Sequence, residues 1–270
     1  MVAEVPYRTP LSAGPAHEME ALPVELSGMI AHMASTSDQT GQPYVPTLSH
    51  EHVEQVRRWH ERAYAEARAE GRGEQSFDYL GARIVVPPEV MPVTRMSHLL
   101  GDAVLTEAGA GERVLDMGTG SGVNAILAAR KGASVLAVDI NPHALAAALA
   151  NAEHNGVADR VTVRYSDVFS EVEGTFDLAV FDPPFRWFRP RDLLESATTD
   201  EGYRAMTTFF RQARQHLAPG GRMLIFFGTS GDLGYLQHLV ADCGFSSEVV
   251  AQDEMTRDGW RVEYFTFRLS

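Results

Sequence analysis

Short apolar segments with the pattern of strands alternate with segments of helical periodicity from about Thr94 to the end of the chain, and this alternation restricts the fold more than any other feature. The strand patterns fall at residues 113–116, 134–139, 161–165, 177–181 and 222–227, followed by two β-rich segments at 247–252 and 261–269. The helical patterns fall at residues 94–107, 123–131, 142–155, 201–217 and 233–243. Because parallel strands need a crossover connection, usually a helix, the sequence predicts an α/β fold with a doubly wound, mostly parallel sheet. Ligands bind to such sheets at the carboxyl ends of the strands.

The part of the chain before this alternation has a different composition. Six of the 14 prolines precede residue 47, and proline fixes φ and lacks a backbone donor, so we expect residues 1–46 to form an irregular arm with a short helix near Glu18–Ala34. After Ser49, which is suited to cap a helix, apolar residues recur at helical spacing up to Gly71. We therefore divide the chain into an N-terminal arm and substrate-capping segment, residues 1–93, and a ligand-binding domain, residues 94–270.

Composition excludes several classes of function. The net charge is −13 and Lys131 is the only lysine, which disfavours nucleic acids and anionic membranes as partners. Cys243 is the only cysteine, so neither an intrachain disulfide nor a cysteine-based metal site can form, and we expect a cytoplasmic location. No run of about 18 apolar residues occurs, and we expect no membrane partner and no bound metal.

A glycine-rich turn follows the first strand of the domain. It reads Asp116-Met117-Gly118-Thr119-Gly120-Ser121-Gly122 and leads into the next helix. Glycines allow a tight turn and the close approach of a ligand. A dinucleotide-binding turn has the spacing G-x-G-x-x-G, in which the third glycine comes one residue later than it does here. The carboxylate of Asp116 would repel a pyrophosphate but would attract an amino group or a sulfonium.

Asp139 ends the next strand, about 20 residues after Gly118. A carboxylate at this position accepts hydrogen bonds from ribose hydroxyls in nucleotide-binding sheets. Asp116 and Asp139 together therefore predict a nucleoside ligand that carries a positive charge.

A second turn, Asp182-Pro183-Pro184-Phe185, follows the fourth strand. Proline has no backbone N–H, so the Pro183 carbonyl and the Asp182 carboxylate can only accept hydrogen bonds, and together they would form a cup for an –NH₂ group. Phe185 would offer a flat face to a planar substrate, and stacking of this kind contributes about 1–3 kcal/mol per base in nucleic-acid complexes. Holding that nitrogen in line with a bound electrophile would lower the barrier of a transfer reaction mainly by orientation.

Taken together, these motifs resemble the class I S-adenosylmethionine (SAM) methyltransferases. Ser166-Asp167-Val168 stands where that family hydrogen-bonds the adenine amine, and Leu217-Ala218-Pro219-Gly220-Gly221 resembles the family's turn before the fifth strand. The second turn resembles the [DN]-P-P-[FYW] motif of amino-methylating members. The resemblance covers about residues 80–270 and implies a seven-stranded, Rossmann-like methyltransferase sheet with a small N-terminal cap and SAM as the cofactor.

The motifs and the resemblance define three sets of expected site residues. The cofactor-binding set is Asp116, Gly118, Thr119, Gly120, Gly122, Asp139, Ile140, Asp167 and Val168. The catalytic set is Asp182, Pro183 and Phe185. The substrate-binding set is Pro184, Arg186, Trp187 and Arg189, which includes part of an arginine-rich segment with interleaved aromatic residues.

Within this family the chain looks most similar to the HemK-like protein-glutamine methyltransferases and their small-domain relatives that act on ribosomal RNA. Residues 79–83 and 90–92 resemble the short hairpin and the proline before the core, and residues 201–204 resemble the helix start after the catalytic turn. HemK-like enzymes usually carry Asn-Pro-Pro-Tyr, whereas this chain has Asp182 and Phe185. Its N-terminal arm also does not resemble their helical release-factor-binding domain.

The sequence therefore predicts a SAM-dependent methyltransferase that methylates a planar nitrogen (an amide, an aromatic amine or a guanidine) of a small metabolite or a protein side chain. Two alternatives stay open. The acceptor could be an exocyclic amine of ribosomal or transfer RNA, which the second turn and the arginine-rich segment favour, or the protein could be a non-catalytic module that binds SAM or a nucleoside. The sequence does not decide between nitrogen, carbon and oxygen as the acceptor atom, nor the oligomeric state, nor whether residues 1–46 act as a lid.

Overall fold

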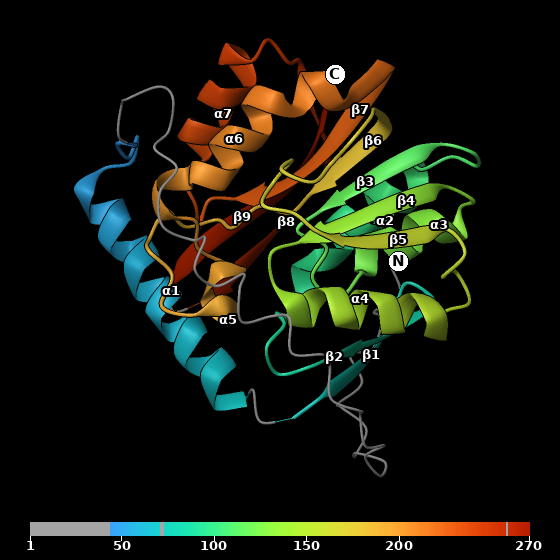
Figure 1. The fold of residues 1–270 in the computed structure, drawn as a ribbon. Helices are drawn as coiled ribbons and strands as arrows, with labels where there is room; N and C mark the ends of the chain where they lie inside the picture. The colour runs from blue at the N-terminus through green and yellow to red at the C-terminus, as the bar shows by residue number, and fades with distance from the viewer. Residues whose placement is uncertain (1–43, 71–72, 258) are drawn as a thin grey trace, which may run out of the picture.

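A seven-stranded sheet with the order β5-β4-β3-β6-β7-β9-β8 forms the centre of the molecule (Figure 1). The structure is a computed structural model that describes residues 44–70, 73–257 and 259–270. The sheet strands are β3 (Arg113–Met117), β4 (Ser134–Asp139), β5 (Val161–Tyr165), β6 (Phe176–Phe181), β7 (Leu217–Gly228), β8 (Ser247–Arg257) and β9 (Trp260–Leu269). The first five run parallel, and β9 and β8 are antiparallel additions. The predicted mostly parallel, seven-stranded α/β sheet is confirmed.

Helices cover both faces of this sheet. They are α2 (His98–Glu107), α3 (Val123–Arg130), α4 (Pro142–His154), α5 (Leu193–Ser196), α6 (Arg204–Ala213) and α7 (Leu233–Asp242), with 3-10 turns at Arg95–Ser97, Glu201–Tyr203 and Arg214–His216. In Figure 1, α6 and α7 lie in front of β6 and β7, and α2 and α3 lie behind the sheet. Because both faces are covered, the central strands β3 and β6 are buried almost throughout.

The strand order reverses between β3 and β6. β3 pairs with β4 on one side and with β6 on the other, and Met117 lies level with both Val138 and Phe181. The carboxyl ends of these three strands therefore lie side by side, at the point where the strand order of the sheet reverses. Ligands of open α/β sheets bind at such a switch point.

Two elements differ from the sequence prediction. The helix predicted at 201–217 is confined to α6 by two left-handed residues at its start, Gly202 and Tyr203, and by a 3-10 turn at its end. The Pro219-Gly220-Gly221 segment lies within β7 as a bulge and does not form a turn before it, because Leu217 already pairs with Phe176. A Cβ at Gly221 would lie 2.8 Å from the Phe176 carbonyl oxygen, so only glycine permits this approach.

The N-terminal part supplies helix α1 (His50–Glu70) and a hairpin of β1 (Gln75–Tyr79) and β2 (Ala82–Val86). Leu80 and Gly81 both have positive φ, as a tight two-residue hairpin turn requires. The buried face of β2 joins the main hydrophobic core, and the Asn151 side chain on α4 bonds to both the N–H and the carbonyl of Val85. The helix expected near Glu18–Ala34 lies outside the described residues.

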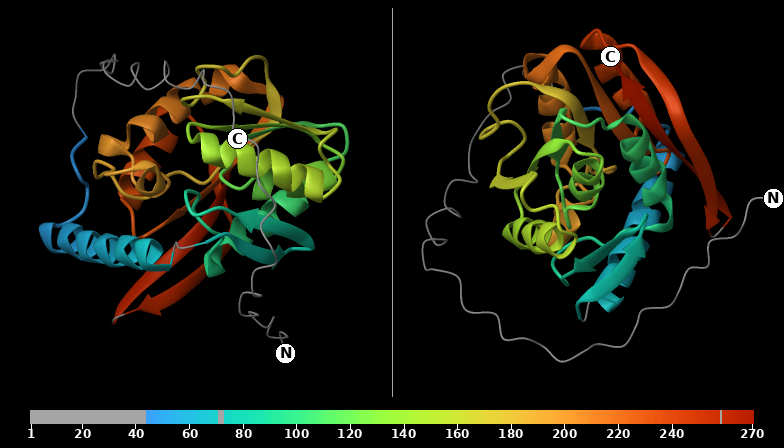
Figure 2. Two further views of the ribbon diagram at one scale, coloured as in Figure 1. Left: turned by 60° about the horizontal axis from the view of Figure 1, so that its bottom comes forward. Right: turned by 90° about the vertical axis from the view of Figure 1, so that its right-hand side faces the viewer.

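Figure 2 shows the long β8–β9 hairpin (red) at one edge of the sheet, opposite the edge formed by β5. Within the described residues, no helix is long and apolar enough to cross a bilayer.

Candidate active site

The glycine turn leaves β3 and is fastened to the end of β4. Gly118, Gly120 and Gly122 have φ of 67°, 55° and 83°, a region that side chains rarely adopt. The Thr119 N–H donates to the Val138 carbonyl at 2.9 Å, and the Gly120 N–H donates to the Asp139 carboxylate at 2.9 Å. The turn therefore links β3 and β4, the strands that carry Asp116 and Asp139.

Two of these glycines serve different purposes. A Cβ at Gly122 would lie 2.9 Å from the backbone of Ala148, so this glycine lets α3 approach α4 closely. A Cβ at Gly120 would meet nothing within 4 Å. Gly120 thus faces open space at the carboxyl edge of the sheet, where a ligand could contact the backbone.

Asp116 lies inside the turn. Its side chain is 2% exposed, and one carboxylate oxygen accepts hydrogen bonds from the Thr119 hydroxyl at 2.6 Å and the Ala125 N–H at 3.1 Å. Desolvation raises the pKa of Asp116 to about 7, the two hydrogen bonds oppose that rise, and the charge of Asp139 adds to it. Asp116 therefore organises the turn from within, and above about pH 7 it places a negative charge beneath the turn.

Asp139 ends β4 and is only partly buried. Its two oxygens accept hydrogen bonds from the N–H groups of Gly120 and Asn141, at 2.9 and 2.8 Å. Burial raises its pKa, and these hydrogen bonds oppose the rise. A carboxylate oxygen can accept a second hydrogen bond, so the partly exposed group can still bind hydroxyls of a ligand. Ile140 follows it and is also partly exposed.

Asp167 follows β5 and forms an ion pair with Arg204, the first residue of α6, at 3.0 Å. Val168 is buried and has a φ of 53°, and the Ser166 hydroxyl donates to its carbonyl at 2.6 Å. These contacts fix the turn after β5 at the same edge as the glycine turn. The partner of Asp167 was missed in the sequence because the residues lie 37 positions apart.

Asp182 directly follows β6 and is exposed to solvent, yet enough protein surrounds it for desolvation to raise its pKa to about 7. The charge of Asp116 raises this pKa further and that of Arg186 lowers it. In the described part of the chain, no hydrogen bond reaches the Asp182 carboxylate or the Pro183 carbonyl. Two acceptors thus stand unused at one turn.

Three carboxylates of raised pKa therefore mark the ends of three neighbouring strands: Asp116, Asp139 and Asp182. Like charges held close together favour a ligand that brings positive charge to them. The open glycine backbone beside them fits a nucleoside with a cationic group.

Phe185 was expected to offer a flat face to the substrate, but the structure places the ring in the core. It is 7% exposed and contacts the rings of Phe226, Phe227 and Tyr264, with centroids 5.6, 4.8 and 6.2 Å away. Gly228 leaves room for it, since a Cβ there would lie 3.3 Å from the Phe185 ring. The ring anchors the turn, and little of its surface is left for stacking.

The four expected substrate-binding residues separate into two groups. Pro184 and Trp187 are partly exposed, and Arg186 is buried beside Asp182. Arg189 is 83% exposed in its side chain and lies 4.0 Å from Glu201. The structure therefore places Pro184, Arg186 and Trp187 in or next to the turn formed by residues 182–185, which we call the acceptor turn. It leaves Arg189 in solvent.

Helix α1 contacts the loop that follows this turn. The His60 imidazole and Glu195 bond at 2.7 Å, and both side chains are almost completely buried. Burial would raise the pKa of Glu195, but hydrogen bonds from Arg191 and His60 lower it to about 2. Tyr64 donates to Asp192 at 2.7 Å. Hydrophobic periodicity in the sequence predicted helix α1, but it did not show that α1 contacts this loop.

A second missed feature lies on the other side of the turn. Tyr203 donates from its hydroxyl to the Phe185 carbonyl at 2.5 Å and accepts from the Asp232 N–H at 2.8 Å. The buried Asp232 carboxylate in turn binds the Tyr44 hydroxyl and the Thr47 N–H at 2.6 and 2.7 Å. The residues that lead into α1 are thus tied to the acceptor turn through two side chains.

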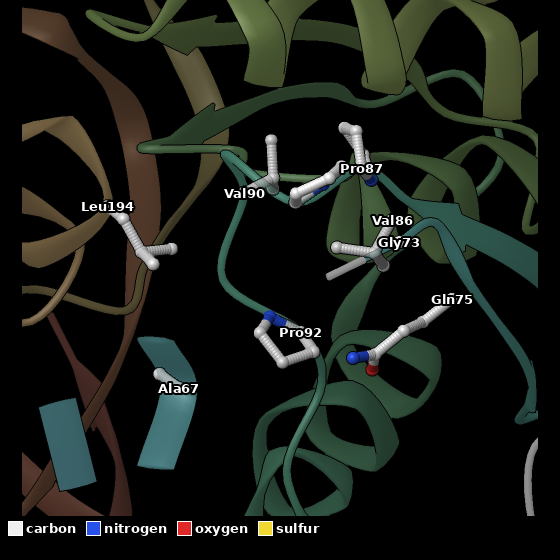
Figure 3. A pocket seen from close by; sticks show the side chains of 9 residues that line it. Ala67, Gly73, Gln75, Val86, Pro87, Val90, Pro92 and Leu194 are labelled. Carbon is white, nitrogen blue, oxygen red and sulfur yellow. The ribbon is translucent and has the colours of Figure 1, made fainter. Parts of the chain in front are cut away.

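A small cavity of about 30 Å³ lies between α1, the hairpin and the proline-rich loop after β2 (Figure 3). Ala67 and Leu194 line one side of it, and Val90, Pro92 and Gln75 line the other. Neither the glycine turn nor Asp182 borders it, and ligand sites usually exceed 300 Å³, so we do not assign it to the reaction. In the described residues, no three metal-ligating side chains cluster.

Comparison with known proteins gives consistent results. A family model described as the methyltransferase small domain matches residues 95–254. The release factor glutamine methyltransferase of Cereibacter sphaeroides is 35% identical over 173 residues, which cover 58% of this chain and 60% of that protein. The ribosomal RNA small subunit methyltransferase C of Chromohalobacter salexigens is 37% identical over 116 residues, or 43% of this chain and 31% of that protein.

The chain thus spans less than two thirds of the length of these relatives. Among solved structures, a tRNA m1G37 methyltransferase of M. jannaschii superposes with a TM-score of 0.54 and 18% identity over 73% of this chain and 57% of that chain, which shows a shared fold. The family model alone matches more than half of the residues and includes the glycine turn and the Asp-Pro-Pro-Phe turn. This protein therefore belongs to the methyltransferase small domain family.

Proposed function

We propose that the protein transfers a methyl group from SAM to a planar nitrogen of a small molecule or a protein side chain. The observation that carries this proposal is the acceptor turn: within the described residues, neither the Asp182 carboxylate nor the Pro183 carbonyl has a hydrogen-bond partner, and this turn lies next to a glycine turn that is open to a ligand. Family membership makes SAM the expected cofactor.

The residues at the carboxyl edge fit this cofactor. The backbone of Gly118 and Gly120 would contact the methionine part, Asp139 would accept the ribose hydroxyls, and Ile140, Asp167 and Val168 would hold the adenine. Bound SAM supplies an electrophilic methyl group on a positively charged sulfur. The negative charges of Asp116 and Asp182 favour that sulfonium.

The acceptor turn orients the nitrogen. Asp182 and the Pro183 carbonyl accept its N–H groups, which directs the nitrogen lone pair away from them and toward the methyl group. Positive charge that develops on nitrogen during the transfer is stabilised by the same two oxygens. The pKa of Asp182, about 7, also suits it to take up the proton that the methylated nitrogen loses.

Charge and one of the relatives support the proposed acceptor class. The net charge of −13 disfavours a polyanionic substrate, and the relative from Cereibacter sphaeroides is named for glutamine methylation. A second candidate is an exocyclic amine of RNA, because another relative is a ribosomal RNA methyltransferase.

Substitution of Asp182 tests the proposal. We expect Asp182→Asn to bind SAM within about threefold of the wild type and to lose at least 100-fold in methyl transfer, since orientation and charge stabilisation both depend on the carboxylate. Calorimetry measures the first quantity and transfer of labelled methyl groups the second. Asp159→Asn, which changes an exposed carboxylate that lies 4.0 Å from Arg160, is the matched control and should change neither. Equal turnover in Asp182→Asn and the wild type would contradict the proposed role.

Labelled SAM and a fractionated cell extract identify the acceptor. We expect label in protein or small molecules. Label found only in RNA, with binding that weakens steeply as salt rises, would establish the second candidate instead.

A further inference from the structure

Tyr203 is a buried side chain held in a backbone conformation that bulky residues rarely adopt. The residue is 0% exposed and has a φ of 54°. Its ring stacks on that of Tyr235, with centroids 5.3 Å apart, and its hydroxyl reaches the acceptor turn. Residues strained in this way persist only where their surroundings hold them, and they collect at functional sites. The strained backbone of Tyr203 therefore places one hydroxyl group at a fixed point beside the acceptor turn.

This hydroxyl bridges two backbone groups whose roles are fixed. It accepts from the Asp232 N–H at 2.8 Å and donates to the Phe185 carbonyl at 2.5 Å. An N–H can only donate and a carbonyl can only accept, so the single hydroxyl proton must point at Phe185. A Cβ at Gly231 would lie 2.3 Å from the same carbonyl oxygen, so only glycine lets the loop between β7 and α7 come this close. The Phe185 carbonyl is thus held by the hydroxyl on one side and confined by this loop on another.

The bond also extends a short backbone ladder into the acceptor turn. The carbonyls of Arg186 and Trp187 accept from the N–H groups of Asp200 and Gly202, at 2.7 and 3.0 Å. The next carbonyl toward the turn is that of Phe185, and there the tyrosine hydroxyl takes the place of a backbone donor. Three consecutive carbonyls are therefore held by one segment, and the last of them belongs to the acceptor turn itself.

The acceptor turn is stiff but has few donors with which to hold itself. Pro183 and Pro184 lack a backbone N–H, and their rings fix φ. A displacement of the Phe185 carbonyl is therefore passed along a stiff chain to the Pro183 carbonyl and the Asp182 carboxylate, the two oxygens that receive the acceptor nitrogen in the proposed function. Misplacement of such a group by about 1 Å can lower the rate of a reaction about 100-fold.

We propose that the Tyr203 hydroxyl is a positioning group for methyl transfer: by holding the Phe185 carbonyl, it fixes the direction in which the acceptor turn presents its two oxygens. This inference rests on the proposed function, and it does not depend on which molecule carries the acceptor nitrogen. Tyr203 acts through the turn and exchanges no proton with the acceptor. Because the glycine turn lies on other strands, the hydroxyl governs the rate of transfer and not the affinity for SAM.

Two phenylalanine variants test this role. Tyr203→Phe keeps the ring and removes only the hydroxyl. Tyr235→Phe is the matched control, because its hydroxyl belongs to the same stacked pair but bonds to Thr207 at 2.8 Å and not to the turn. Calorimetry measures the affinity for S-adenosylhomocysteine, and urea denaturation measures stability. Single-turnover transfer from labelled SAM to the extract fraction that the wild type labels gives the rate and its dependence on the amount of that fraction.

We expect Tyr203→Phe to lower the saturated rate roughly 10- to 100-fold, while the affinity for S-adenosylhomocysteine and the amount of fraction needed for half the maximal rate stay within about threefold. Tyr235→Phe should keep the rate within about threefold, although it too loses a buried hydrogen bond.

The outcomes separate this inference from the proposed function. An unchanged rate in Tyr203→Phe, or an equal loss of rate in Tyr235→Phe, would overturn the positioning role and leave methyl transfer in place. No transfer of label by the wild type would instead remove the proposed function, and the inference with it. If Tyr203→Phe does not fold, NMR of the wild type decides. The Tyr203 hydroxyl proton should exchange slowly and give a cross-peak to the Asp232 amide proton, and a rapidly exchanging hydroxyl would refute the proposal.

Discussion

At the scale of single residues, the properties of the site depend on what surrounds each glycine and each carboxylate. Gly120 and Gly122 share positive φ and lie two positions apart, yet one faces open space and the other presses against Ala148. Asp116 and Asp182 share a pKa of about 7, yet one is enclosed by its turn and the other is exposed. Residues of the same type therefore differ in what their substitution should do.

Alanine substitutions of the glycines should separate ligand binding from stability. Gly122→Ala should lower the free energy of unfolding by about 2–4 kcal/mol, because positive φ and a clash with the Ala148 backbone add up. Gly120→Ala should cost only about 1–2 kcal/mol but weaken SAM binding at least tenfold, since its Cβ occupies the open space. Gly111 also has a positive φ, 82°, and a Cβ there would meet nothing within 4 Å, so Gly111→Ala, away from the site, should leave SAM binding unchanged. Urea denaturation and calorimetry measure the two quantities.

The raised pKa of Asp116 should give stability and SAM binding opposite dependences on pH. The folded protein holds a proton on Asp116 up to about pH 7, whereas the unfolded chain releases it near pH 4, so the free energy of unfolding should fall as pH rises between these values. SAM is positively charged and prefers the ionised carboxylate, so its affinity should rise over the upper part of the same range, with release of protons.

Asp116→Asn checks this assignment because it keeps a hydrogen-bond acceptor for Thr119 and Ala125 but cannot ionise. Its stability should vary less with pH between 4 and 7 than that of the wild type. Equal pH profiles for the two proteins would show that Asp116 is not the titrating group.

At the scale of elements, helix α1 and the loop after the acceptor turn form one unit. One face of α1 contacts the loop through Arg57 over the Phe188 ring, through His60 with Glu195, and through Tyr64 with Asp192. Burial lowers the pKa of His60, so its neutral ring donates from Nε2 to the ionised Glu195. The loop that carries Arg186 and Trp187 is therefore held from the N-terminal side.

Removing the carboxylate of Glu195 should loosen this unit. Glu195→Ala should lower the free energy of unfolding by about 2–4 kcal/mol, because the buried His60 and the Arg191 backbone N–H lose their acceptor. Methyl transfer should fall while SAM affinity is kept, since the glycine turn is untouched. Glu61→Ala breaks only an exposed ion pair with Arg191 and should cost about 1 kcal/mol or less. A comparable loss of the free energy of unfolding in both variants would show that the buried contact stabilises the protein no more than the exposed ion pair does.

At the scale of the whole molecule, the proposed ligand site lies at the carboxyl ends of the parallel strands, where the strand order of the sheet reverses. Three acidic residues lie at the same place. The three carboxylates lie at the carboxyl ends of β3, β4 and β6: Asp116 is the second-last residue of β3, Asp139 is the last residue of β4, and Asp182 directly follows β6. A cationic ligand that bridges these strands would stabilise the folded state as a unit, since it binds only when all of them are in place.

SAM should therefore raise the melting temperature of the whole protein. At 100 times its dissociation constant a ligand adds about 2.7 kcal/mol, which corresponds to roughly 5–10 °C for a chain of this size. Thermal unfolding followed by circular dichroism measures the shift. Asp139→Ala should abolish it by removing the acceptor for the ribose hydroxyls, and an unchanged shift in that variant would place the nucleoside elsewhere.

The sequence alone determined the sheet, its helices, the two turns and the family, because hydrophobic periodicity and glycine or proline positions act over short distances along the chain. Helix 201–217 was predicted too long, since the left-handed Gly202 and Tyr203 depend on contacts with the acceptor turn.

Only the tertiary structure decided how the side chains of these turns are used. It buried the Phe185 ring, buried the Arg186 guanidinium beside Asp182, and joined α1 to Glu195. Each of these depends on residues far apart in the chain, whose distances, burial and charges are set by packing and not by local pattern.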